Sequence, residues 1–177
     1  PFTKGLSELY TNVVSVRTTN ELIDEGSLVP LKVYAATSID MTGAKVIAGE
    51  WAESEIEKRG SVIIGDVVSE WTDKVHKHFG YPAKTMVFSA TVAHGDELCR
   101  QFQAAGYNFQ QVSYKDGNGE DRRALLEEFK RPNSSIVGLV SVDALGRGFD
   151  CPDVLVGVSC RPFRKSFSSF IQQVGRV

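Results

Sequence analysis

The sequence predicts an α/β domain with three layers, in which a mostly parallel sheet carries helices on both faces. From Lys84 onward, short apolar runs of strand length alternate with amphipathic stretches of helical length. These helical stretches are long enough to make the crossover connections that neighbouring parallel strands require. The chain has 177 residues, 42% of them hydrophobic, which suits one ordinary globular domain rather than a disordered or fibrous chain.

The residues before Lys84 carry weaker signals. We expect residues 1–34 to form a lead-in or connector and residues 35–177 to form the domain itself. The elements expected here are a short N-capped helix at 19–26, an extended, unpaired stretch at 28–34, a loop at 37–49, and helices at 50–59 and 66–79. Asp66 follows an apolar run, and we interpret it as a helix N-cap rather than a metal ligand.

The elements expected from Lys84 onward are strands at 85–90, 109–114, 136–142 and 154–158 and helices at 94–106, 120–130 and 166–177. In an open parallel sheet, a ligand site lies beyond the carboxyl ends of the strands. Functional residues are therefore expected in the turns after Ala90, Tyr114, Val142 and Val158.

Charge and cysteine content exclude several classes of function. The chain has 20 Lys and Arg against 22 Asp and Glu, so the whole molecule is not a general polyanion binder. Residues 154–177 carry four basic side chains and no acidic one, which could attract phosphates or simply form a solvated helix end. Three dispersed cysteines and three histidines without ligand spacing predict free thiols and no metal site. With no secretion signal and no membrane-length apolar run, we expect a cytoplasmic protein without membrane contact.

Glycine-rich nucleotide-binding motifs are missing from the sequence. The chain has neither a G-x-x-x-x-G-K-[ST] phosphate loop nor a G-x-G-x-x-G fingerprint. Residues 116–121 resemble a calcium loop, but Asp121 stands where the sharp turn needs glycine. A nucleotide is therefore expected to bind only weakly to this chain alone.

The first informative stretch is the turn after the strand at 136–142. Residues 141–153 contain Asp143, Gly148 and Asp150 and reach a proline directly after Cys151. Glycine lets the backbone approach a ligand closely, and Asp150 is placed to accept hydrogen bonds from a sugar hydroxyl. An ordinary strand–loop–strand crossover explains the same residues equally well.

The second informative stretch is the final helix. Gln172 and Arg176 are four residues apart and share one helix face, and Arg176 follows Gly175. An arginine in this setting can reach a transferring phosphate and stabilise its charge. A capped amphipathic helix with a surface arginine is the alternative.

Three segments in order resemble the motifs of the second RecA-like domain of a superfamily-two (DEAD/DEAH-type) helicase or translocase. Residues 84–91 resemble motif IV, residues 141–152 motif V, and residues 169–176 motif VI in its Gln-x-x-Gly-Arg form. The opening five residues resemble those that follow motif III. The resemblance covers residues 84–177 and extends loosely over the lead-in.

The resemblance implies ATP as the cofactor, with Mg²⁺ held by a first RecA-like domain outside this chain. Arg176 would face the β- and γ-phosphates, and Gln172 would couple the nucleotide state to domain closure. Gly148, Asp150 and Gly175 would line the nucleotide, with Asp150 on the ribose.

The resemblance also implies nucleic-acid contacts that do not read the base sequence. The residues expected to touch the backbone of the nucleic acid are Ser89, Thr91, Ser141 and Asp143. The implied partners are single- or double-stranded nucleic acid, with DNA favoured over RNA, and the first RecA-like domain of the same polypeptide.

Two departures from the family pattern bear on these expectations. Val142 stands where many relatives carry threonine, and the second arginine of motif VI would fall beyond Val177. The resemblance thus implies one part of a longer motor, cut within motif VI and inactive as an ATPase alone. Two other functions stay open: a non-enzymatic interaction domain on a degenerate helicase lobe, and an unrelated phosphate-binding doubly wound domain.

Overall fold

The computed structural model describes residues 14, 16–35, 39–60, 64–113, 119–142, 149–162, 171, 173 and 175. The chain divides into two compact units, at residues 1–35 and 36–177.

The first unit contains the expected short helix, α1 (Thr19–Asp24). Its N-cap is Thr18, whose side chain accepts a hydrogen bond from the N–H of Glu21, while the Glu21 carboxylate accepts one from the N–H of Thr18. This capping box satisfies donors that a helix start leaves without partners. Gly26 follows the helix at a φ of +76°. Residues 29–35 belong to no strand, as Pro30 predicts.

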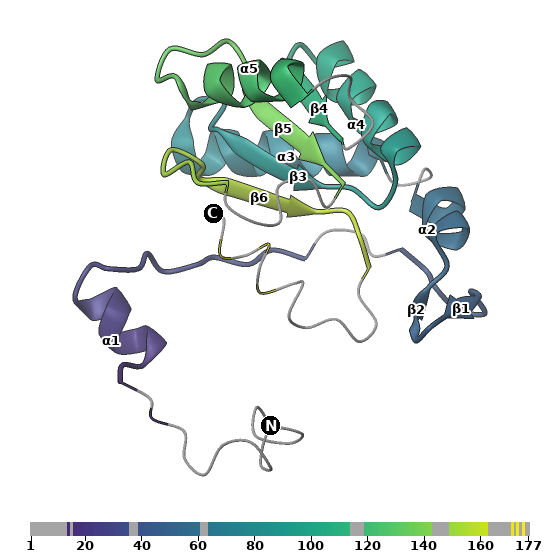
Figure 1. Ribbon diagram of the computed structural model, residues 1–177, viewed down its shortest axis with the longest axis horizontal. Helices are drawn as coiled ribbons and strands as arrows, with labels where there is room; N and C mark the ends of the chain where they lie inside the picture. Colours follow the sequence, from purple (N-terminus) through teal and green to yellow (C-terminus); the bar gives the residue numbers. More distant parts are fainter. Residues whose placement is uncertain are drawn as a thin grey trace. The chain divides into compact units, whose positions relative to one another are not determined.

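The second unit is built on a parallel sheet of four described strands, β3 (Thr85–Phe88), β4 (Phe109–Val112), β5 (Gly138–Ser141) and β6 (Val156–Ser159). Their order is β4-β5-β3-β6, so the two later strands flank β3 (Figure 1). All three pairings are parallel and bring the four carboxyl ends to one edge. The predicted α/β fold is confirmed.

Helices cover both faces of this sheet (Figure 1). Alternate strand residues point to opposite faces, and they fall into two separate apolar clusters. One cluster joins Val87, Val140 and Phe109 to α3 (Ile64–Phe79) and α4 (Val92–Ala104). The other joins Met86 and Leu139 to α5 (Gly119–Lys130). The sheet is thus the middle of three layers.

An aromatic cluster packs helices α3 and α4 against one face of the sheet. The rings of Phe102 and Phe109 stack with centroids 3.8 Å apart, and Trp71 packs edge-on against both at 5.3 Å. The indole N–H of Trp71 donates to the hydroxyl of Thr85, which is also buried. Gly138 lies beneath this cluster, in the strand beside Phe109.

The region before α3 differs from the prediction in two respects. Within the expected loop, β1 (Val46–Ile47) and β2 (Glu50–Trp51) form an antiparallel hairpin, and α2 (Glu53–Gly60) begins only after it. Both turn residues, Ala48 and Gly49, have positive φ, as a type I′ turn requires. The second difference is that Asp66 lies inside the first turn of α3, so its interpretation as an N-cap is wrong. A carboxylate there still favours the helix dipole.

Candidate nucleic-acid interface

A serine stands at or directly after the end of every described strand of the parallel sheet. These residues are Ser89, Ser113, Ser141 and Ser159. The register places Ser141 level with Phe88 and Val112, and Ser159 level with Phe88. Four hydroxyl-bearing residues therefore gather at the carboxyl edge, the expected position of a ligand site.

Three of these serines are buried: Ser113 is fully enclosed, and Ser89 and Ser141 contact each other. Ser89 is 2% exposed and Ser141 is 1% exposed. The N–H of Ser89 donates to the carbonyl of Ser141 at 3.0 Å, and the Ser89 hydroxyl donates to the same carbonyl at 3.4 Å. Both serines lie at the predicted edge, but their side chains face the protein interior.

Helix α4 begins at this edge directly after β3. Thr91 is its N-cap, in extended conformation, and its hydroxyl accepts a hydrogen bond from the N–H of His94 at 3.1 Å. The first two N–H groups of the helix, those of Val92 and Ala93, have no acceptor among the described residues. Ala93 is exposed. Two open N–H groups at the positive end of a helix dipole make an anion-binding geometry.

The first turn of α4 also packs against α2. His94 is 4% exposed, and its ring lies against Gly60, where an added Cβ would come within 3.5 Å of Cε1. Burial lowers the pKa of His94 below its ordinary value of 6.5, and the nearby charge of Glu57 opposes this only in part. The Nδ1 atom of His94 has no hydrogen-bond partner among the described residues. The imidazole is therefore neutral and serves as packing.

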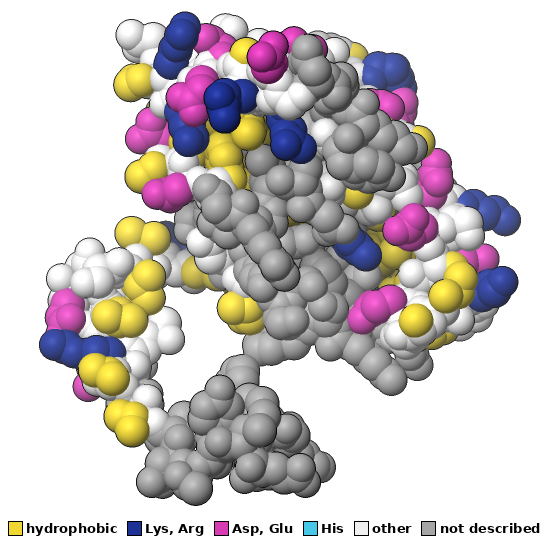
Figure 2. Space-filling model, in the orientation of Figure 1, with side chains coloured by type: hydrophobic (Ala, Val, Ile, Leu, Met, Phe, Trp, Pro, Cys, Tyr) yellow, Lys and Arg dark blue, Asp and Glu magenta, His cyan; other side chains and the backbone are white. Residues whose placement is uncertain are grey.

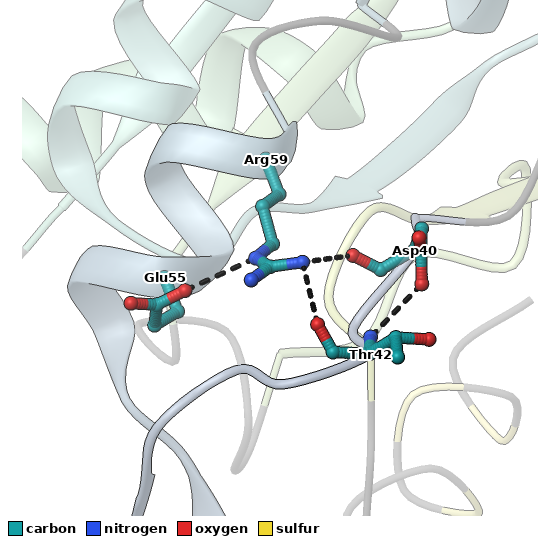
Figure 3. A network of polar contacts seen from close by, with 4 residues as sticks. All are labelled: Asp40, Thr42, Glu55 and Arg59. Carbon is teal, nitrogen blue, oxygen red and sulfur yellow. Dashed lines mark hydrogen bonds and ion pairs between the residues drawn. The ribbon is translucent and has the colours of Figure 1, made fainter.

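A polar network ties α2 to the loop that precedes the hairpin (Figure 3). Arg59 donates through Nε to Glu55 at 3.0 Å, and through Nη1 to the carbonyls of Asp40 and Thr42 at 2.7 and 3.2 Å. The Asp40 carboxylate accepts from the N–H of Thr42, and hydrogen bonding by the Thr42 side chain, together with this N–H, lowers the pKa of Asp40. One guanidinium thus ties the loop at 40–42 to α2, which in turn supports His94 and the start of α4.

The residues expected at the nucleotide lie after β5 and β6. Asp150 is exposed, while its neighbours Phe149 and Cys151 are buried and anchor it to the α5 side of the sheet. The N–H of Gly175 donates to the carbonyl of Ile171 at 2.9 Å, which continues the expected helical turn.

A side-chain contact links this helical segment to the sheet. The Ser159 hydroxyl donates to Oε1 of Gln173 at 3.2 Å. The segment that carries Gly175 is thereby tied to the carboxyl end of β6. Of the residues expected to function, Asp143, Gly148, Gln172 and Arg176 lie outside the described part of the chain.

Gln111 is a residue at this edge that the sequence patterns did not single out. Its side chain extends from β4 to the first turn of α4, where Nε2 donates to the carbonyl of Val92 at 3.1 Å. The available signal is a glutamine in a short strand whose end residues, Phe109 and Val112, are fully buried. This pattern indicates that the glutamine makes a polar contact, but it does not identify the group that the glutamine contacts.

The surface of the described residues carries mixed charge. Figure 2 shows Lys and Arg side chains interspersed with Asp and Glu over the face in view. Among residues that the structure describes, no three His, Cys, Asp or Glu side chains are grouped to hold a metal ion. Within the same residues, no helix is both long and apolar enough to span a bilayer.

The parallel sheet, its helical layers and the polar carboxyl edge define a RecA-like α/β domain. Residues 68–177 match the family model of the Helicase conserved C-terminal domain, and the chain belongs to that family. The resemblance inferred from the sequence motifs is confirmed.

One curated relative is a 51.5 kDa protein of a Lactococcus phage (isolate 7-9), 30% identical over 170 residues. The match covers 96% of this chain and 36% of the relative, so the chain spans about a third of that protein's length.

Two solved structures share the fold. A fragment described as an HsdR subunit of a type I restriction enzyme from Vibrio vulnificus YJ016 superposes with a TM-score of 0.57 at 24% identity, covering 70% of this chain and 25% of the other. Domain 2 of the DEAD-box helicase Mss116p, bound to an RNA duplex, gives a TM-score of 0.54 at 21% identity, covering 67% and 45%.

Proposed function

We propose that this chain acts as the second motor domain of an ATP-dependent nucleic-acid helicase or translocase. The observation that carries the proposal is the start of α4, where the open N–H groups of Val92 and Ala93 stand at the carboxyl edge of a helicase-family sheet. Such donors bind a phosphate without reading the attached base. Movement along a strand requires this indifference to sequence.

In this proposal, Thr91 and the first turn of α4 hold one backbone phosphate. Ser89 and Ser141 shape the floor beneath it, because their side chains are buried in the sheet. Asp143 supplies a further contact to the nucleic acid. DNA is favoured over RNA, although the Mss116p domain in the comparison was bound to an RNA duplex.

The nucleotide would lie mainly on a first RecA-like domain, which also holds Mg²⁺. Asp150 then binds the ribose, and Gly148 and Gly175 allow the backbone to approach the nucleotide. Arg176 stabilises charge on the transferring phosphoryl group, and Gln172 links nucleotide state to domain closure. The exposure of Asp150 between two buried neighbours supports this role, because a fixed backbone presents its carboxylate outward.

The test is the binding of a fluorescein-labelled 12-nucleotide oligothymidylate and its ribo-uridine counterpart, measured by fluorescence anisotropy. We expect both to bind, with Kd rising steeply with salt, because phosphate contacts release counterions. Ala93→Asp places a negative charge where the phosphate would lie, while an acidic residue in the first turn favours the helix. It is expected to weaken binding at least about tenfold at low salt.

Ala104→Asp, the same exchange at the far end of the same helix, is the matched control. It is expected to leave Kd within about twofold of the unmodified chain, since it lies beyond one Debye length from the first turn at moderate salt. Binding that ignores salt, or equal Kd values for the two variants, would contradict the proposed interface.

A further inference from the structure

The strand β4 carries two adjacent glutamines with different roles. Gln111 lies on the same face as Phe109, the face covered by α3 and α4, and its Nε2 donates to the carbonyl of Val92. Gln110 points to the opposite face, and its Nε2 donates to Oδ1 of Asn108, the residue directly before β4, at 2.7 Å. Only the first of these amides connects the strand to the helix that starts the candidate interface.

The side chain of Gln111 comes close to the backbone of α4 at Gly95. A Cβ added at Gly95 would lie 2.5 Å from Oε1 of Gln111 and 3.0 Å from Oγ of Ser89. The backbone of α4 therefore approaches β4 and the end of β3 where no side chain intervenes. The amide of Gln111 fits between the helix and the strand.

The orientation of the Gln111 amide is set by its partner. The carbonyl of Val92 can only accept, so Nε2 must face it and Oε1 must point the other way. That Oε1 atom is buried and has no hydrogen-bond partner within the described residues.

The peptide between Val92 and Ala93 connects this contact to the open donor. A peptide unit is planar, so the group whose carbonyl accepts from Gln111 also carries the N–H of Ala93 at its other end. Fixing the carbonyl fixes the direction of that N–H. A hydrogen bond at the carbonyl also polarises the peptide and strengthens its N–H as a donor.

We propose that Gln111 is a positioning residue for backbone binding: its amide holds and polarises the Val92–Ala93 peptide so that the Ala93 N–H meets a phosphate. This inference rests on the proposed function of the α4 start. Gln111 itself touches no phosphate; it acts through one peptide unit.

The test compares Gln111→Met with Gln110→Met in the full chain. Methionine retains the length and apolar stem of glutamine but cannot donate to a carbonyl. Gln111→Met is expected to weaken binding of the labelled 12-nucleotide oligothymidylate about fivefold, as when one hydrogen bond to a charged group is weakened. The amide proton of Ala93 should also shift upfield in ¹H–¹⁵N spectra without oligonucleotide. Gln110→Met should leave both the Kd and the Ala93 signal unchanged.

The two readouts separate this inference from the proposed function. If the unmodified chain binds no oligonucleotide, the proposed function fails, and an Ala93 shift confined to Gln111→Met still supports the positioning of the peptide. If the chain binds but the two variants have equal Kd values, the inference is overturned. Should Gln111→Met fail to fold, Gln111→Asn serves instead, because its shorter amide does not reach Val92.

Discussion

Replacing Gly138 with alanine tests how tightly β5 and β4 are packed. The new Cβ would lie no further than 2.6 Å from three ring atoms of Phe109, namely Cδ1, Cε1 and Cζ. The ring cannot retreat, because it is fully buried, stacked on Phe102 and abutted by Trp71. Overpacking of a closed core costs about 1–3 kcal/mol, and we expect the upper end of that range or more. An alanine in a strand otherwise favours folding by about 0.5–1 kcal/mol over glycine, so the two effects have opposite signs.

The assay is urea unfolding of the chain followed by far-UV circular dichroism. Gly65→Ala in α3 is the matched control, because an added Cβ there meets no atom within 4 Å, and it should stabilise by about 0.5–1 kcal/mol. In a Phe109→Leu background, Gly138→Ala should cost at least about 1 kcal/mol less than in the unmodified chain. A stabilised Gly138→Ala variant, or purely additive effects in the double variant, would refute the packing argument.

Three further predictions concern protonation and catalysis. Burial holds the pKa of His94 in the folded chain below 6.5. His94 therefore binds a proton more readily in the unfolded chain than in the folded one. The midpoint temperature of thermal unfolding should fall as the pH drops from about 7 to 5. His94→Leu should flatten that dependence while His78→Gln, at an exposed position, should not, and equal slopes would rule out His94 as the cause. The isolated chain should show no ATPase activity above background in a phosphate-release assay, since it has no phosphate loop. Within a longer protein that contains the first domain, Arg176→Ala should lower turnover at least about tenfold, and unchanged turnover would remove Arg176 from the site.

The elements between Lys84 and Ser159 could be predicted because local pattern and tertiary role agree there, whereas most of the helix predicted at 166–177 lies outside the described residues. The run at 85–88 is buried at every position, as expected of a central parallel strand. The helix predicted at 94–106 starts two residues earlier, at Val92, because Thr91 supplies the cap.

The hairpin at 46–51 escaped prediction because its turn breaks the usual rule. A type I′ turn favours asparagine or glycine at its first central position, whereas this chain has Ala48 at a φ of +51°. The contact of Gln111 with Val92 escaped for another reason: it joins residues whose proximity follows from the packing of α4 on β4, which periodicity does not report.

The strand order has a consequence for how the chain is made. The central strand β3 pairs with β5 and β6, which lie roughly 50 and 70 residues later in the sequence. At about 5–20 residues per second, a ribosome delivers those partners several seconds after β3 has been synthesised. During that interval, both edges of the apolar segment from Met86 to Phe88 lack the strands with which they pair in the folded domain. The folding step most exposed to aggregation is therefore set by the order of the strands in the sheet.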